Sequence, residues 1–413
     1  MKEYEILNGG YQAQYTKFSR GSGCYLYDEN NVEYIDMVMG AGSLILGHAN
    51  EQVVNAIQEQ SQHGSIFLQN NDKVQQLSQS IAEKIPEHLT KYIYCNSGSE
   101  ATQRAVRIAR AATNKSVIAS FQGGWHGMNE WTLLDDGGRF GATNQSLPTR
   151  GIPDGALKET LSLPYNSENT FTLLRKHADV IAAVIIEPLQ GSNPQPEIKY
   201  YLQKLEETCT DLNIILIFDE IITGFRINSG GGANYFSIKP DIATYGKILG
   251  GGLPIGMVAI SDDIHHKTFL DPNKSMLTGG TFSANPLSAA AGNAAIIQLD
   301  EHSYKKLDGL GALFRQLANE KFVHFNIPFK ADGLGSISRI YFTDQPFKNR
   351  EERDQLEIKN SLQSQFKTKL WEKKIIWPTN GIICNALCQT NELIQHVVEQ
   401  VVDTAINIIE LPR

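Results

Sequence analysis

The sequence predicts an α/β protein whose central sheet is mostly parallel and covered by helices on both faces. Short apolar runs alternate with helical patterns through the middle of the 413 residues. These runs are apolar without interruption, as expected of strands that are buried on both faces. The two ends of the chain carry a different mixture of short strands and helices. We therefore expect a large domain of residues 51–300 and a small α+β domain made of residues 1–50 and 301–413.

Six apolar runs are the predicted strands of the large domain: Tyr92–Cys95, Val117–Ser120, Val180–Ile186, Ile214–Phe218, Ile242–Tyr245 and Gly256–Ile260. Helical periodicity is clear after Glu100 and again across Tyr201–Thr208 and Pro286–Leu299. Residues 131–165 are rich in Gly, Asp, Asn, Thr and Pro, so we expect a long loop there.

The ends of the chain predict the elements of the small domain. Near the N-terminus, two strand patterns at Gly23–Tyr27 and Glu33–Val38 flank a turn-rich segment. The C-terminal part predicts a strand over Ser336–Phe342, a long polar helix near Arg350–Glu372 and a closing helix from about Asn391.

Composition excludes several classes of protein. A hydrophobic content of 41% and a charged content of 20% are typical of a globular protein. The net charge of −8 and the lack of a Lys/Arg-rich block argue against nucleic-acid binding. Residues 1–5 lack the apolar core of a signal peptide, and no apolar run approaches the roughly 20 residues that cross a bilayer. We therefore expect a cytoplasmic protein that binds neither nucleic acid nor membrane.

The cysteines are odd in number and scattered, which disfavours a disulfide framework: Cys24, Cys95, Cys209, Cys384 and Cys388. Cys384 and Cys388 have the loose spacing of metal ligands, but no second ligand pair lies near them in the sequence. We expect buried free thiols and no metal site.

Lys247 is the most informative residue, because it lies among glycines in the segment Thr244–Gly252. Such a lysine is a flexible amine close to the backbone. A predicted strand upstream ends in Asp219 and Glu220, and a carboxylate at the end of a buried strand needs a positive partner. Pyridoxal 5'-phosphate uses both groups, since its aldehyde forms a Schiff base with lysine and its ring nitrogen pairs with a carboxylate. For Lys247 taken alone, a surface lysine in a glycine-rich turn is the alternative.

A possible phosphate site precedes the helix that begins near Glu100. The segment Asn96–Ala101 follows a predicted strand and opens that helix, where free backbone N–H groups hold anions. Ser97 could cap the helix, and Gly98 would allow a phosphate to approach the backbone closely. An ordinary helix cap explains the segment equally well.

Further candidates lie at neighbouring strand ends. Trp125 and His126 lie between glycines and could stack on a planar ring and orient a cofactor oxygen, respectively. A half-buried tryptophan and a structural histidine are the alternatives. Glu187 ends another predicted strand and would face the same edge as Asp219, where open α/β sheets bind ligands. Thr281 precedes a helix and could supply a second phosphate contact.

In their order along the chain, these blocks resemble the class-III (ω-type) pyridoxal-phosphate aminotransferases of fold type I. Within that family, the chain is most similar to the glutamate-1-semialdehyde 2,1-aminomutase subgroup. The likeness runs from about Phe18 to the C-terminus and is carried by these segments: Tyr34–Asp36, Leu46–Ala49, Asn96–Ala101, Trp125–Gly127, Glu187–Pro188, Asp219–Arg226, Gly246–Gly251, Gly280–Thr281 and Phe342–Pro346.

The resemblance implies a fold and a set of site residues. Fold type I implies a mostly parallel seven-stranded sheet in the large domain. Lys247 would be the Schiff-base lysine and Asp219 the partner of the ring nitrogen. The other implied contacts of the cofactor are Gly98 and Ser99 at the phosphate, Trp125 and Ile221 on the two ring faces, and His126, Glu187 and Thr281.

The resemblance also implies the reaction. Such enzymes move an amino group from an amine or amino acid to a keto or aldehyde acceptor by a ping-pong mechanism through aldimine and ketimine stages. The cofactor becomes pyridoxamine 5'-phosphate midway, and the freed Lys247 carries the proton. The family implies a homodimer in which Thr281 reaches the cofactor of the neighbouring subunit.

Departures from the aminomutase pattern leave the outcome open. Residues 9–15 lack the arginine that helps to hold the substrate carboxylate, and Gly40–Gly42 replaces a segment that usually carries an aromatic side chain. Gln122 stands where Glu is common, and Trp377–Gly381 lacks a nearby Glu. We expect an aminotransferase with a different and bulkier substrate, with an aminomutase as the alternative. A decarboxylase, a racemase and a catalytically silent binding subunit are smaller alternatives, and the sequence does not identify the donor or acceptor.

Overall fold

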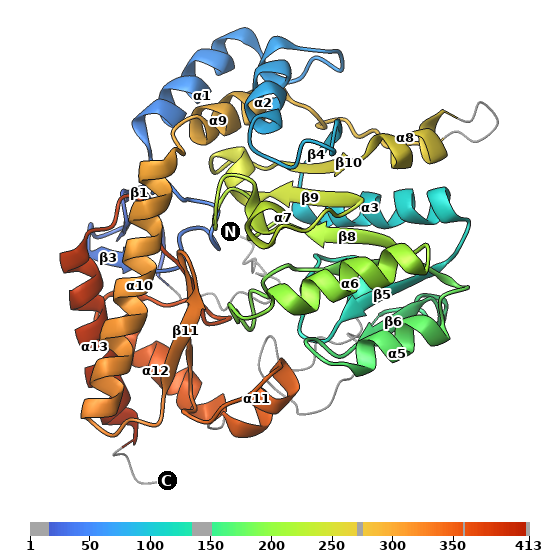
Figure 1. Cartoon of the computed structure of the whole chain (residues 1–413). Helices are drawn as coiled ribbons and strands as arrows, with labels where there is room; N and C mark the ends of the chain where they lie inside the picture. The colour runs from blue at the N-terminus through green and yellow to red at the C-terminus, as the bar shows by residue number, and fades with distance from the viewer. Residues whose placement is uncertain (1–15, 134–150, 271–275, 358–359, 410–413) are drawn as a thin grey trace.

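The central feature of the computed structural model is a seven-stranded sheet. The structure describes residues 16–133, 151–270, 276–357 and 360–409. The strands lie in the order β4-β10-β9-β8-β7-β5-β6 (Figure 1). Their bounds are β4 (Lys91–Cys95), β5 (Val117–Phe121), β6 (Thr160–Leu163), β7 (Ile181–Ile186), β8 (Ile215–Asp219), β9 (Ile242–Gly246) and β10 (Gly256–Ile260). Only β10 runs antiparallel to its neighbours within this sheet, so the predicted mostly parallel sheet is confirmed.

Successive side chains along most of these strands face opposite sides of the sheet. Ala183 and Ile185 of β7 belong to the apolar cluster formed with α3 (Gly98–Thr113) and α8 (Asp262–Phe269). Val184 and Ile186 belong to the cluster of the opposite face. The helices that contribute to that cluster include α2 (Asp72–Ala82), α5 (Asn169–Lys176), α6 (Lys199–Asp211), α7 (Gly231–Phe236) and α9 (Pro286–Ile296), with α1 (Glu51–His63) packed on α9. Every residue of β7 is buried, as expected of a strand covered on both sides.

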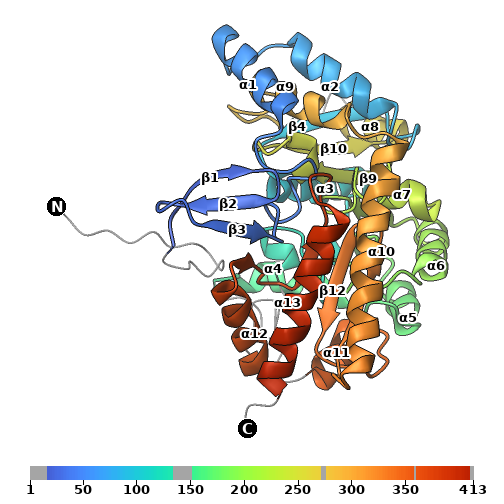
Figure 2. The same ribbon diagram turned by 90° about the vertical axis from the view of Figure 1, so that its left-hand side faces the viewer.

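A second apolar core is built mainly from the C-terminal part of the chain. It includes side chains of α10 (Glu301–His324), α12 (Asn360–Glu372) and α13 (Asn391–Ile409), and α10 and α13 lie side by side (Figure 2). These helices pack on the three-stranded sheet of β11 (Lys330–Leu334), β12 (Ile337–Tyr341) and β14 (Ile382–Cys384). Met37 from the N-terminal part joins the same core.

The two ends of the chain meet in a third sheet. Its strands are β1 (Phe18–Ser22), β2 (Tyr25–Asp28), β3 (Glu33–Asp36) and β13 (Ile375–Ile376), and β13 pairs with β3 in parallel. The remaining elements are η1 (Glu130–Thr132), α4 (Asp154–Lys158), η2 (Lys247–Gly250) and α11 (Arg350–Leu356). The division into domains at residues 50 and 300 stays a prediction. Within the described residues, no helix combines the length and the apolar character needed to cross a membrane.

Two expectations about single elements are wrong. The long loop expected over residues 131–165 contains η1, α4 and the edge strand β6, whereas residues 134–150 lie outside the described residues. The single helix expected over Arg350–Glu372 is two helices: α11 ends at Leu356, where Glu357 has an extended backbone (φ −65°, ψ 138°), and α12 spans Asn360–Glu372. The Glu357 carboxylate accepts a hydrogen bond from the Phe342 N–H at 3.2 Å, which fixes this residue against the end of β12.

Candidate active site

A cavity of about 170 Å³ lies at the edge of the sheet where β7, β8 and β9 end. Its lining brings together residues that are far apart in the sequence: Gly98, Ser99, Thr102, Trp125, His126, Gly127, Glu187, Asp219, Ile221, Ile222 and Lys247. All the predicted site residues except Thr281 therefore lie around one cavity. Their positions follow from the fold, because parallel strands deliver the residues after their carboxyl ends to the same edge.

Lys247 directly follows β9 and begins the short helix η2. Its side chain is half-buried and its backbone is left-handed, with φ 48°. Such a conformation is costly for a residue with a side chain and is retained where the surroundings enforce it. Gly246 precedes it, and a Cβ added there would lie 3.1 Å from the Ile221 side chain. The glycine before Lys247 thus allows tight packing of this turn against the cavity wall.

Asp219 ends β8 and is buried in the cavity wall. Its Oδ2 lies 2.7 Å from His126 Nδ1, and the two side chains are 3% and 1% exposed. Its Oδ1 accepts the Ile221 N–H at 3.1 Å and the Thr244 hydroxyl at 3.3 Å. These contacts fix the plane of the carboxylate before any ligand arrives.

His126 is tied into the site by its backbone as well as its ring. Its carbonyl accepts hydrogen bonds from the Thr102 hydroxyl at 2.6 Å and from the Asn129 amide at 2.9 Å. Its Nε2 is buried and has no hydrogen-bond partner in the described part of the chain. The histidine therefore orients Asp219 through Nδ1, and the cofactor contact expected from the sequence stays a prediction.

Glu187 immediately follows β7, and its carboxylate joins the loop after β7 to the loop that contains Trp125. Its Oε1 accepts the Trp125 N–H at 2.8 Å, and its Oε2 accepts the Gly191 N–H at 3.0 Å. The loop after β7 also supports the Trp125 loop through the Ser192 hydroxyl, which donates to the Gly123 carbonyl at 2.6 Å. Trp125 is half-buried at the cavity. Glu187 thus positions Trp125 and also lines the cavity.

The N-terminus of α3 forms an anion cradle on the same cavity. Ser97 caps the helix, with its Oγ accepting the Glu100 N–H at 3.2 Å. The first backbone N–H groups of a helix lack partners within the helix, and they carry the positive end of its dipole. Gly98 is the first helical residue, and a Cβ there would lie 3.1 Å from Ile221 Cδ1. A side chain at position 98 would therefore crowd Ile221 at the start of α3, and glycine leaves that space open.

Three lining residues were not predicted from the sequence. Gly127 has a left-handed backbone (φ 84°), and a Cβ there would lie 2.3 Å from Ser99 Oγ. Thr102 lies one helical turn after Gly98, and that spacing was a usable signal. The third residue, Ile222, follows the predicted contact Ile221 directly. Gly127 gives no such signal, because its role depends on the close approach of two separate loops.

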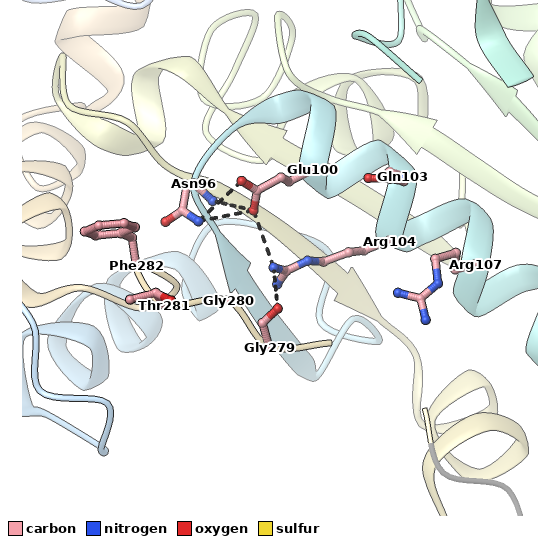
Figure 3. Close-up of a pocket in the computed structure, with 9 residues that line it drawn as sticks. All are labelled: Asn96, Glu100, Gln103, Arg104, Arg107, Gly279, Gly280, Thr281 and Phe282. Carbon is pink, nitrogen blue, oxygen red and sulfur yellow. Dashed lines mark hydrogen bonds and ion pairs between the residues drawn. The ribbon is translucent and has the colours of Figure 1, made fainter. Parts of the chain in front are cut away.

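Thr281 does not line this cavity. It lies on a second cavity of about 420 Å³, to which α3 also contributes side chains (Figure 3). The residues that line this cavity are Asn96, Glu100, Gln103, Arg104, Arg107, Gly279, Gly280, Thr281 and Phe282. There Arg104 donates to the Gly279 carbonyl at 3.3 Å and pairs with Glu100 at 3.4 Å. The expected contact of Thr281 with the cofactor of a neighbouring subunit stays a prediction.

Glu220, the second acid after β8, serves another purpose. It is 1% exposed and accepts hydrogen bonds from the Gly232 N–H at 2.8 Å, the Ala233 N–H at 2.7 Å and the Thr223 hydroxyl. Burial raises the pKa of its carboxyl to about 7. This residue anchors the start of α7 and does not line the cavity.

Comparisons with known proteins agree with this geometry. A family model described as aminotransferase class-III matches residues 7–362. The glutamate-1-semialdehyde 2,1-aminomutase of Methanocaldococcus jannaschii is 34% identical over 395 residues, covering 95% of this chain and 89% of that protein. The protein of the same name from Methanococcus maripaludis is 36% identical over 333 residues, covering 80% and 77%.

Solved structures show the same architecture. An omega-transaminase from Sphaerobacter thermophilus superimposes with a TM-score of 0.90 at 26% identity, covering 98% of this chain and 94% of that one. A transaminase described as having PLP bound gives a TM-score of 0.85 at 25% identity, covering 95% and 91%.

Proposed function

Because this chain belongs to the class-III aminotransferase family, we propose that it moves an amino group between an amine or amino acid donor and a carbonyl acceptor with pyridoxal 5'-phosphate. One observation carries this proposal. Lys247 and the buried carboxylate of Asp219 line the same cavity as the N-terminus of α3. A lysine, an acid and an anion cradle are the groups that hold the aldehyde, the ring nitrogen and the phosphate of this cofactor.

The residues present fit the cofactor. The N–H groups of Gly98 and Ser99 would hold the phosphate, and the missing Cβ at position 98 leaves room for it. Trp125 and Ile221 would contact the two faces of the ring, while Asp219 would meet its nitrogen. A structurally similar transaminase has PLP bound, which supports this assignment. When bound, the cofactor supplies an electrophilic aldehyde carbon and a ring that accepts electrons.

With the cofactor bound, the residues around it would have different roles in the reaction. Asp219, held by His126, would keep a proton on the ring nitrogen. The Lys247 amine would accept the proton from the carbon that carries the substrate's amino group. Glu187 holds Trp125 in place through the Trp125 N–H. Pyridoxamine 5'-phosphate is the form of the cofactor that we expect between the two half-reactions.

An aminomutase is the second candidate, and the names of the relatives favour it. Proteins named glutamate-1-semialdehyde 2,1-aminomutase share 34–36% identity with this chain over most of its length. Against it stand the departures noted in the sequence at Gly40–Gly42, Gln122 and Trp377–Gly381; the altered segment at residues 9–15 lies outside the described residues. We therefore keep intermolecular transfer as the main proposal.

Stoichiometry separates the two reactions. The purified holoenzyme should be mixed with a panel of amines, with and without a keto acid, and also with glutamate-1-semialdehyde alone. Loss of the visible cofactor absorbance with an amine, restored by a keto acid, would support transfer between two substrates. Isomerisation of the semialdehyde without a keto acid would identify an aminomutase. Bound cofactor that no amine converts would contradict both and indicate a silent subunit.

Lys247→Ala tests the residue on which the proposal depends. We expect a folded protein that binds the cofactor loosely and shows no turnover, because the Schiff-base amine and proton carrier are lost. Cofactor absorbance after borohydride treatment, together with circular dichroism, reports binding and fold separately from activity. Near-normal transamination by this variant would reject the assignment.

We further propose a cytoplasmic homodimer with small-molecule substrates. The exposed side chains of Leu277 (82%) and Phe282 (58%) flank Thr281 and support an interface there. Light scattering of the purified protein measures the oligomeric state. Mixed dimers of Lys247→Ala and Thr281→Val chains test the shared site, because each mixed dimer would keep one site that has both native residues.

A further inference from the structure

Cys24 and Cys388 come from opposite ends of the chain and meet in one apolar cluster. They share this cluster with Met39 and Ala386, where Cys24 is 4% exposed and Cys388 is half-buried. Cys24 directly precedes β2, and Cys388 lies in the segment between β14 and α13. Neither residue lines the cavity that contains Lys247. The pair is therefore separate from the site described above.

Close packing of the backbone holds the two thiols together. The Cys388 Sγ lies 2.7 Å from the point that a Cβ on Gly47 would occupy, so any larger residue at position 47 would collide with this sulfur. The Cβ of Cys388 lies 3.9 Å from the corresponding point on Gly23, the residue next to Cys24. The segments of Gly23 and Gly47 are joined by paired backbone hydrogen bonds between Gly23 and His48, at 3.0 and 2.7 Å.

The two thiols also influence each other's titration. A side-chain hydrogen bond between them lowers the pKa of Cys24 and raises that of Cys388. Cys95 and Cys209 provide a contrast, since burial raises the pKa of each thiol, to about 12 for Cys95. Because the thiolate is the reactive form of cysteine, these solitary thiols are inert by comparison.

We propose that Cys24 and Cys388 form a reversible dithiol–disulfide site, oxidised by hydroperoxides or by small-molecule disulfides and restored by dithiols. With hydrogen peroxide, one sulfur becomes a sulfenic acid and releases one water. The second sulfur then attacks the first, forms the S–S bond and releases another water. Two thiols lose two electrons and two protons in all, and one peroxide becomes two waters.

The disulfide would tie the start of β2 to the segment before α13. The turn that contains Met39 packs on the same cluster, and its residues Met39 and Ala41 have left-handed backbones with φ 47° and 54°. A covalent link at this point restricts the unfolded chain strongly, because it closes nearly the whole sequence into a loop. We expect the oxidised protein to unfold at a higher temperature than the reduced protein.

Thiol mapping on the native holoprotein tests the proposal directly. The protein is treated with hydrogen peroxide or oxidised glutathione, its remaining thiols are alkylated under denaturing conditions, and its peptides are identified by mass spectrometry before and after dithiothreitol. We expect a cross-link between the peptides of Cys24 and Cys388 that dithiothreitol releases. Cys95 and Cys209 should remain alkylated as free thiols and serve as internal controls.

A serine variant distinguishes pairing from simple oxidation. Cys388→Ser should abolish the cross-link and the rise in unfolding temperature, and because Cys388 is half-buried the change is mild. Three results would overturn the proposal: no cross-link under either oxidant, glutathione attached to Cys388 while Cys24 stays a thiol, or pairing that is spread over all five cysteines. The mapping needs no turnover, so its outcome is independent of the proposed enzyme activity.

Discussion

Asp219 presents its two carboxylate oxygens to different partners at the end of β8. One oxygen meets the His126 ring at 2.7 Å, and the other accepts the Ile221 N–H at 3.1 Å. Because both side chains are almost fully buried, little water screens the carboxylate. A charge that is fixed in place before the ligand binds does not have to reorganise during the reaction, which is how such groups lower barriers.

Replacing Asp219 with a neutral residue should therefore slow the reaction more than replacing His126, which holds Asp219 in place. We expect Asp219→Asn to reduce kcat/KM by about 10²- to 10³-fold, as for the loss of one preorganised electrostatic group. His126→Gln should give a smaller loss, because Asp219 keeps its charge and its contacts with Ile221 and Thr244. Steady-state kinetics and the cofactor absorption spectrum check both variants. An Asp219→Asn enzyme with wild-type kinetics would refute the role.

Glu220 makes the stability of the fold depend on pH. Its pKa rises from the ordinary 4.5 to about 7 in the folded protein because it is buried, so the folded state holds this proton more tightly than the unfolded state. The unfolding free energy should therefore fall as the pH rises from about 4.5 to 7. The difference amounts to about 3 kcal/mol at most.

Glu220→Gln removes this contribution while keeping an acceptor for the α7 backbone. Urea unfolding of the wild type and the variant between pH 5 and pH 8 measures it. We expect the variant to gain stability relative to the wild type as the pH rises, since its amide never has to ionise. A difference between the two proteins that does not change with pH would contradict this prediction.

At the scale of elements, sequence alone located the strands that are buried on both faces. β7 to β10 are mostly apolar, and the expected Gly256–Ile260 matches β10 at both ends. β6 escaped prediction because it is a four-residue edge strand, mostly half-buried, that is ordered by pairing with β5. The end of α11 at Leu356 also depends on tertiary contacts, since Glu357 is held by the end of β12.

The residues of the candidate site also fall into two groups, those that the sequence predicts and those that depend on tertiary contacts. Lys247, Asp219 and Glu187 could be predicted because each ends or directly follows a strand, and strand ends share one edge of the sheet. Gly127 could not, because its function depends on how closely its loop approaches Ser99. The same limit applies to the bond between His126 and Asp219, which joins loops that are distant in sequence.

The helix that carries the anion cradle offers a test with a matched control. Gly98→Ala places a Cβ 3.1 Å from Ile221, on the surface where the phosphate would bind. We expect at least a 10-fold weaker affinity for the cofactor, because either the phosphate or Ile221 must move. Fluorescence titration of the apoenzyme measures this affinity.

Gly309→Ala is the control, since Gly309 lies within α10 and a Cβ there meets nothing within 4 Å. It should leave the affinity unchanged and stabilise the fold by about 0.5–1 kcal/mol, as alanine does inside a helix. Equal cofactor affinity in both variants would show that position 98 does not border the phosphate.

At the scale of the whole molecule, one buried guanidinium joins the segment after β8 to both ends of the chain. Arg226 is 1% exposed and donates to the carbonyls of Gly42 and Asn385, at 2.5 and 3.1 Å, and to the Ser336 hydroxyl at 3.1 Å. Gly42 belongs to the N-terminal part, whereas the other two flank strands of the C-terminal sheet. Burial lowers the pKa of this guanidinium, so its charge is stabilised mainly by these oxygens.

Arg315 is a natural control for this contact. It also donates to three oxygens, those of Gly335, Ile337 and Ser338 at 2.9–3.1 Å, but all of them lie in the C-terminal part together with Arg315 itself. The two arginines make similar numbers of bonds, but Arg315 is half-buried whereas Arg226 is 1% exposed, so replacing Arg315 should cost less free energy. Only the loss of Arg226 should weaken the connection between the two apolar cores.

We therefore expect Arg226→Met to lower the free energy of unfolding by roughly 3 kcal/mol, since buried acceptors lose their charged donor, and Arg315→Met to lower it by less. Calorimetry should then separate them. The Arg315 variant should unfold in one transition, whereas the Arg226 variant should show two, because the N-terminal and C-terminal segments no longer hold the sheet at residues 215–227. Limited proteolysis between the transitions should cut near residues 50 and 300, which also tests the predicted domain boundaries. A single transition for both variants would mean that the cores are joined by their apolar contacts and not by Arg226.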